Sequence, residues 1–182
     1  MRIRLVKQQT GGHLVTAILD DGVEMHVAET DHDHVVPHEI SHLALEGTLG
    51  FAYGFWGCVS RGALFNGMRV LSGRGEQEAL AVSQTVRKEA GARFINAEIM
   101  VAAIEENYPG ARVGDVEECR ELAMKNYTAL SDLLAAADLP EATRRWAELV
   151  GAWADVPRGG AMERDWVSAA EPIDKDAPVS NQ

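Results

Sequence analysis

The chain has 182 residues, of which 46% are hydrophobic and 25% are charged, and this ordinary globular composition argues against a wholly disordered protein. The formal net charge of -11 would repel a phosphate backbone or an anionic lipid surface, so we expect neither nucleic acid nor a membrane as a partner. Cys58 and Cys119 lack the spacing of a zinc motif, and the N-terminus lacks the apolar core of a signal peptide. These features favour a cytoplasmic protein with reduced thiols.

The first part of the chain carries the patterns of β-strands. Residues 2–6 alternate in polarity, residues 14–19 are rich in strand-forming side chains, and residues 23–27 alternate again. Asp21-Gly22, between the second and third runs, is a strong hairpin signal. We therefore predict a three-stranded antiparallel meander.

The rest of the chain has mainly helical periodicity. We predict an α+β fold, in which the small N-terminal antiparallel meander is followed by a mostly helical bundle. Residues 1–156 are expected to form one domain, and residues 157–182 an irregular C-terminal tail in which Trp166 is a candidate anchor. The predicted helices cover residues 37–46, residues 49–62, a stretch from Glu76 that breaks at Gly91 and ends at Tyr108-Pro109-Gly110, residues 115–137, and a last segment from Pro140. Residues 67–75 are predicted to form a loop.

The most distinctive motif is His38-Glu39-Ile40-Ser41-His42, which matches the pattern HExxH. Two histidines four residues apart on a helix are separated by roughly 40° of rotation and roughly 6 Å of rise, so both rings can reach one metal ion. The glutamate beside the first histidine can remove a proton from a metal-bound water, whose pKa a divalent cation lowers toward about 7. We therefore expect zinc or another divalent metal at His38 and His42, with Glu39 as the general base of a metal-dependent hydrolase.

The motif resembles that of zincin-type metallohydrolases, and its position on a predicted helix after a sheet agrees with this resemblance. The third ligand remains open. Glu46 shares the helix face, although about 12 Å of rise separates it from His38. Glu98 is the zincin-like choice, whereas His34 and Asp33 are the local choices.

A longer stretch around the motif resembles a family of small bacterial proteins that has no established activity. It begins at Pro37, includes HExxH and Glu46, and continues through Gly54-Phe55-Trp56-Gly57 to Gly62. Members of that family carry a His-Asp/Glu-x-x-His-x-x-x-Glu helix followed by an aromatic-glycine element. The resemblance covers the N-terminal third of the chain and implies a related fold and a candidate site, but no reaction.

The same residues also have a non-catalytic interpretation. His38 and His42 can form hydrogen bonds with Glu39, Glu46 or backbone carbonyls, as isolated histidines usually do. The aromatic side chains within 49–62 favour a core or a dimer face over a ligand site. The alternative hypothesis is therefore a non-catalytic helical dimer or accessory protein, with the predicted helix over 49–62 as the interface. A phosphate loop at 67–75 and a catalytic thiol at Cys58 are disfavoured.

Overall fold

The computed structural model describes residues 1–30, 36–107 and 116–167, and its α+β class agrees with the prediction. The predicted meander is confirmed as β1 (Arg2–Lys7), β2 (His13–Ile18) and β3 (Glu24–Thr30), paired antiparallel in chain order. Two further strands, β4 (Arg69–Ser72) and β5 (Ala161–Asp165), extend it to an antiparallel sheet of order β4-β3-β2-β1-β5.

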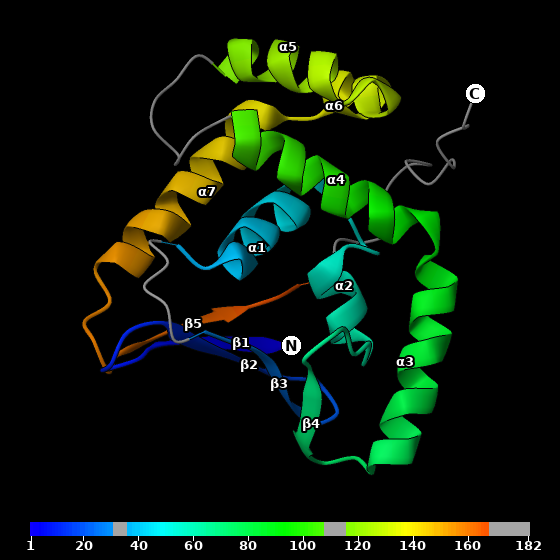
Figure 1. Ribbon diagram of the computed structural model, residues 1–182, viewed down its shortest axis with the longest axis vertical. Helices are drawn as coiled ribbons and strands as arrows, with labels where there is room; N and C mark the ends of the chain where they lie inside the picture. The colour runs from blue at the N-terminus through cyan, green and yellow to red at the C-terminus, as the bar shows by residue number, and fades with distance from the viewer. Residues whose placement is uncertain (31–35, 108–115, 168–182) are drawn as a thin grey trace.

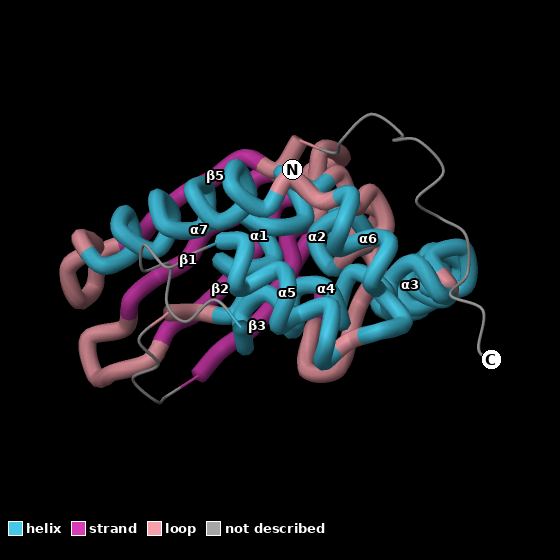
Figure 2. Tube along the Cα trace, turned by 90° about the horizontal axis from the view of Figure 1, so that it is seen from above, coloured by secondary structure: helices cyan, strands magenta, loops and turns pink. Residues whose placement is uncertain are grey.

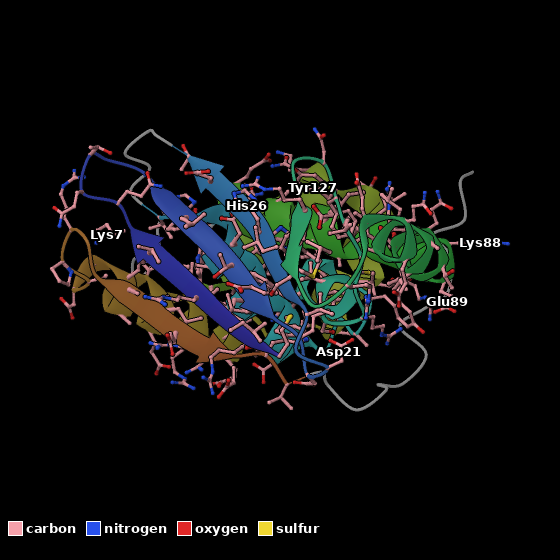
Figure 3. All side chains as sticks on the ribbon, turned by 90° about the horizontal axis from the view of Figure 1, so that it is seen from below. Lys7, Asp21, His26, Lys88, Glu89 and Tyr127 are labelled. Carbon is pink, nitrogen blue, oxygen red and sulfur yellow. The ribbon has the colours of Figure 1, made fainter. Side chains whose placement is uncertain are left out.

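The two faces of the sheet differ because side chains alternate along each strand. On the inner face they are apolar and buried: Ile3, Leu5, Val15, Ala17, Met25 and Met162. On the outer face, Arg2 pairs with Asp165 and Arg4 with Glu163 across β1 and β5. Figure 3 views this outer face, with the strands in front and the helices behind them.

Helices cover the inner face of the sheet (Figures 1 and 2). The central helix is α1 (His38–Leu49), which packs against α7 (Leu139–Ala154) and α4 (Ala92–Asn107). The short α2 (Phe55–Ser60) and the long α3 (Glu76–Ala90) lie toward the β4 edge of the sheet. Three short elements lie beyond α4 and α7, farther from the sheet: α5 (Val116–Asn126), the 3-10 helix η2 (Thr128–Leu130) and α6 (Ser131–Ala136).

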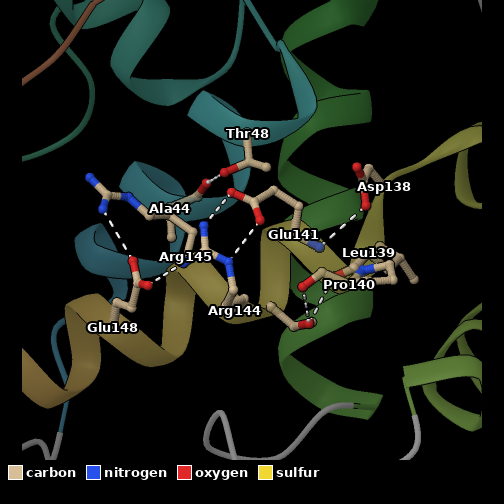
Figure 4. A network of polar contacts seen from close by, with 10 residues as sticks. Ala44, Thr48, Asp138, Leu139, Pro140, Glu141, Arg144, Arg145 and Glu148 are labelled. Atoms are coloured by element: carbon tan, nitrogen blue, oxygen red, sulfur yellow. Dashed lines mark hydrogen bonds and ion pairs between the residues drawn. The ribbon is translucent and has the colours of Figure 1, made fainter.

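The sequence of α7 explains its position in the helical layer. The Asp138 side chain accepts a hydrogen bond from the Glu141 amide at 3.2 Å, and a proline lies in the first turn, where its missing N–H costs nothing. The apolar side of α7 is buried, including Trp146, Leu149 and Trp153. The outer side carries ion pairs in which Arg144 and Arg145 bind the acidic groups of neighbouring turns (Figure 4).

Several predicted element boundaries were wrong. The first helix continues through Gly47 and ends at Leu49, because the left-handed residue that stops it is Gly50, with φ of 75°. The segment 49–62 is not one helix: a turn precedes α2, which has only six residues. The loop predicted for 67–75 contains β4, and the helix predicted for 115–137 is divided among α5, η2 and α6.

The prediction of an irregular tail was also wrong for residues 161–165. These residues form β5, because Met162 pairs with Leu5 and turns into the core while its polar neighbours face outward. Trp166 follows at 5% exposure, and its amide donates a hydrogen bond to the Met1 carbonyl at 2.8 Å. The anchoring role expected for Trp166 is therefore confirmed, while residues 168–182 lie outside the described part of the chain.

Within the described ranges, no helix is both long enough and apolar enough to cross a lipid bilayer.

The burial of Trp166 predicts that the segment after α7 stabilises the fold. We expect Trp166→Ala to lower the free energy of unfolding by about 3–5 kcal/mol, because it removes a buried aromatic side chain. Val167→Ala is the matched control, since that side chain is 79% exposed, and it should change the value by no more than about 0.5 kcal/mol. Denaturant unfolding measures both, and equal effects would show that the Trp166 side chain contributes no packing.

Candidate functional site

The HExxH motif occupies the first two turns of α1, directly after Pro37, whose extended backbone precedes the helix. His42 is almost completely buried, whereas the His38 side chain is 57% exposed. The two rings lie perpendicular to each other, with their centroids 4.5 Å apart. The pair is therefore open to solvent at His38 and closed at His42.

The Nε2 atoms of the two imidazoles face each other. Nε2 of His38 lies 2.9 Å from Nε2 of His42. The other nitrogen of each ring contacts a carboxylate: Nδ1 of His42 lies 2.7 Å from Glu46, and Nδ1 of His38 lies 3.0 Å from Glu105. Each ring is thus fixed at Nδ1 and presents Nε2 to its neighbour.

Glu46 is fully buried and links three parts of the site. Besides contacting His42, its carboxylate accepts hydrogen bonds from the backbone amides of Phe55 at 2.6 Å and Trp56 at 3.0 Å. These amides belong to the first turn of α2, where the N–H groups of a helix have no partners within it. The carboxylate also lies against Gly54, where a Cβ atom would come within 2.3 Å of the Glu46 carboxyl carbon, so only glycine fits at this position.

The helix α4 supplies two more carboxylates, Glu98 and Glu105, which are seven residues apart and so lie on one face. Because Glu105 contacts His38 and Glu98 lies 3.8 Å from Nδ1 of His42, α4 runs antiparallel to α1 at this point. Oε1 of Glu98 is buried and has no hydrogen-bond partner among the described residues. Its position makes Glu98 the acidic group with unused bonding capacity in the site.

Burial and neighbouring charges shift the pKa values of several groups in different directions. Burial raises the pKa of Glu98, and the charge of Glu46 adds to this effect. Burial also works to raise the pKa of Glu105, but hydrogen bonds from His38 and Ser41 outweigh it, so the pKa is lowered. The hydrogen bond to Glu105 raises the pKa of His38. The two carboxylates of α4 are therefore electrostatically distinct: the pKa of Glu105 lies below that of a free glutamate and the pKa of Glu98 lies above it.

The Glu39 side chain has a partner outside the histidine pair. Its Oε2 lies 3.5 Å from Nε2 of His13, at the start of β2, and His13 packs edge-on against Trp153. Burial works to raise the pKa of Glu39, but the hydrogen bonds that its carboxylate accepts from His13 and from its own backbone amide lower it. Glu39 is therefore held as a carboxylate between α1 and the sheet.

The structure brings together most of the residues that the sequence singled out. His42, Glu46 and Glu98 offer ligand atoms that all lie within 4.8 Å of one another, and His38 joins this group through its contact with His42. His34 and Asp33, the local candidates for a third ligand, lie outside the described residues.

Sequence reasoning missed two residues of the site, Glu105 and His13. The seven-residue spacing between Glu98 and Glu105 on a predicted helix was a usable signal for the first. His13 precedes a predicted strand with no motif around it, and only the packing of α1 on the sheet pairs it with Glu39.

Cys58 does not take part in the chemistry of the cluster. Burial raises the pKa of its thiol to about 12, the nearby carboxylate of Glu46 adds to the effect, and its Sγ donates a hydrogen bond to the Tyr53 carbonyl. A thiol in this state is protonated at neutral pH and is a poor nucleophile. Trp56 and Cys58 are fully buried, in agreement with the core role expected for this segment.

Comparison with known proteins adds no relative: no family model, curated protein or solved structure matches the chain.

The contacts of Glu46 predict a large effect of a small substitution. We expect Glu46→Gln to lower the free energy of unfolding by about 2–4 kcal/mol, because the amide group of glutamine would point an N–H at a buried backbone N–H or at His42. Glu148→Gln on α7 is the matched control, since this half-exposed carboxylate forms only surface ion pairs, and it should cost less than about 1 kcal/mol. Urea unfolding of metal-free protein measures both values. Equal losses of unfolding free energy in the two variants would mean that the hydrogen bonds of Glu46 do not stabilise the start of α2.

Proposed function

We propose that the protein binds a divalent metal ion, with zinc as the first candidate, through Nε2 of His38 and Nε2 of His42. The observation that carries this proposal is the 2.9 Å approach of these two nitrogens while both Nδ1 atoms are engaged by carboxylates. Histidines that bind metals usually present one nitrogen to the ion and donate a hydrogen bond from the other to a carboxylate or carbonyl.

Counting protons supports a cation between the rings. The three contacts, two from Nδ1 to carboxylates and one between the Nε2 atoms, need three protons if each is a hydrogen bond. Two neutral imidazoles carry only two protons. Glu46 does not supply the third, because the same oxygen that contacts His42 also accepts the Phe55 amide. The missing positive charge is either a third proton, carried by His38, whose pKa the hydrogen bond to Glu105 raises, or a metal ion between the rings. We favour the metal ion, because two nitrogens bound to one tetrahedral zinc lie about 3.3 Å apart, close to the 2.9 Å between the two Nε2 atoms.

A second arrangement of the ion is less favourable. His42, Glu46 and Glu98 could hold a metal on the Nδ1 side of His42. That arrangement would use the oxygen that caps α2 and would replace the contact that orients the His42 ring. We therefore assign Glu46 and Glu105 the role of orienting the two histidines. We propose Glu98 as the third ligand, because its buried Oε1 has no hydrogen-bond partner among the described residues and lies beside the His42 ring. Its contact is with Nδ1 at 3.8 Å, so the carboxylate has to turn toward Nε2 to bind the ion.

We further propose that the metal serves hydrolysis, because the exposure of His38 leaves the centre accessible to water and substrate. Structural zinc sites are closed, whereas catalytic sites keep an open position. A bound divalent ion would supply Lewis acidity and make water more acidic. Glu39 is the proposed base: it is kept ionised by His13 and lies next to His38 in the chain.

The alternative of a non-catalytic dimer through residues 49–62 has less support. The side chains that would form its apolar face, such as Trp56, Cys58 and Val59, are buried within the chain itself.

Metal titration tests the binding proposal. We expect one zinc ion per chain by elemental mass spectrometry after dialysis, and loss of binding in His42→Ala and His38→Ala. The affinity for zinc should fall by more than about 100-fold in each variant, because removal of a residue that only orients a metal ligand already lowers metal affinity by about 10–100-fold. Glu98→Gln should also weaken binding, and Glu105→Gln should do so by about 10–100-fold.

His26→Gln is the control for the metal titration, because His26 lies on β3 and has no contact with the cluster in the described residues. Stoichiometric zinc in the His38→Ala, His42→Ala double variant would refute the site.

Turnover of p-nitrophenyl acetate by zinc-loaded protein tests the hydrolytic proposal. Glu39→Gln should lower kcat by about 10²–10⁴-fold and leave the metal content unchanged, as expected when a general base is removed. Glu29→Gln, an exposed carboxylate on β3, should leave kcat unchanged. Full activity in Glu39→Gln would mean that the pair with His13 is structural and that Glu39 is not the base.

A further inference from the structure

A second candidate site lies where α3 ends and α4 begins, apart from the histidine cluster (Figure 1). The cavity there has a volume of about 490 Å³, which is within the range of small-molecule sites. Its walls come from the last turns of α3, the first turn of α4, Cys58 of α2, and Phe65 in the segment after α2. None of the residues that form the metal proposal lines it.

The floor of the cavity suits a flat, apolar group. The rings of Phe65 and Phe94 are stacked with their centroids 4.7 Å apart and an interplanar angle of 14°. Ile95, which also lines the cavity, is 56% exposed, a large value for an isoleucine. Because Phe65 is already stacked on Phe55 and on Phe94, an aromatic ligand would pack against the exposed edges of these rings and against Ile95, and it would remove their apolar surface from water.

The charge of the cavity is opposite to that of the whole chain. No acidic residue lines it, although the chain has a net charge of -11. The Arg87 guanidinium lies 5.7 Å from the centre of the Phe65 ring, and within the described ranges it has no ion-pair partner. Lys88 also lines the cavity, but it extends outward from the end of α3 (Figure 3). Arg87 is therefore the cation positioned to bind an acidic group on a ligand whose rings rest on the floor.

We propose that this cavity binds a small aromatic anion, such as an aryl carboxylate or sulfonate, with its rings against Phe65 and Phe94 and its acidic group at Arg87. Arg87 lies in the last turn of α3, where the helix dipole stabilises a cation. The dipole accounts for the arginine but not for the apolar cavity beside it. The proposal does not depend on the metal centre. Phe65 is stacked on Phe55, which contacts His42, so the two sites share packing but no ligand atom.

Two related dyes separate the anionic from the apolar part of the proposal. The probe is 8-anilinonaphthalene-1-sulfonate, and N-phenyl-1-naphthylamine has the same rings without the sulfonate. We expect the native protein to bind one sulfonated dye per chain in a saturable fluorescence titration. Arg87→Met keeps the apolar stem of the side chain and removes its charge. It should lower the affinity for the sulfonated dye about tenfold and the affinity for the uncharged dye less than about twofold. Lys125→Met on α5 is the charge control and should leave the affinity for both dyes unchanged.

A blocking variant tests the location. Gln84→Trp places an indole in the cavity wall from an exposed position on α3, and it should abolish binding of both dyes. Gln77→Trp, two turns earlier on the same face, is its control and should bind like the wild type. Circular dichroism and the unfolding midpoint verify that each variant is folded.

Three results would overturn the proposal. The first is the absence of saturable binding of the sulfonated dye, and the second is dye binding that is retained in Gln84→Trp. The third is an equal loss of affinity for both dyes in Arg87→Met, which would mean that the cavity is apolar without an anion-binding group. The His38→Ala, His42→Ala double variant should bind the dye like the wild type, so failure of the metal proposal would not be mistaken for failure of this one.

Discussion

The buried carboxylate of Glu46 is the interaction on which the site and its surroundings depend. A charge with no exposure to water is costly unless hydrogen bonds and an opposite charge or dipole surround it. Here two backbone amides at the start of α2 and the ring of His42 fill that role. The same contacts join α1 to α2 and orient the imidazole. Gly54 completes the arrangement, because any side chain at that position would occupy the space of the carboxylate.

The orientation of His42 then determines what the pair with His38 can do. A ring held at Nδ1 can offer only Nε2, and the contact of His38 with Glu105 imposes the same restriction on the second ring. Two helices that run antiparallel, α1 and α4, supply the histidines and the carboxylates respectively. The arrangement concentrates acceptors around two facing nitrogens. This supports the proposal of a cation there more strongly than the acidic composition of the chain does.

The fold separates this cluster from the other chemistry of the molecule. The outer face of the sheet carries charged pairs between β1 and β5, which neutralise each other near the surface. The apolar cavity with Arg87 lies at the junction of α3 and α4, on the far side of the stacked rings of Phe55 and Phe65. The proposed metal site and the proposed anion site are thus compatible in one chain, because they are built from different parts of the helical layer.

The sequence could predict those parts of the structure that depend on local patterns. The alternation of residues 2–6 and 23–27 predicted β1 and β3, because one face of an antiparallel sheet is buried and the other is not. The strand-forming side chains of residues 14–19 predicted β2. The spacing of His38 and His42 predicted that both lie on one side of a helix. The ends of elements were predicted less well. Gly47 resembles a helix stop, but the backbone turns only at Gly50, and the aromatic run after it forms a turn and a six-residue helix.

What the sequence determined by itself was the α+β class, the N-terminal meander and the placing of a His-Glu-His motif at a helix start, since these follow from periodicities of two and 3.6 residues. The tertiary structure decided which carboxylate each of these side chains contacts. Glu105 lies 67 residues from His38 and His13 lies 26 residues before Glu39, so no local rule connects them. The strand β5 is similar: five residues without a clear pattern become a strand only because the edge of β1 offers them partners. Long-range packing sets these contacts, and it is not encoded at any single position of the chain.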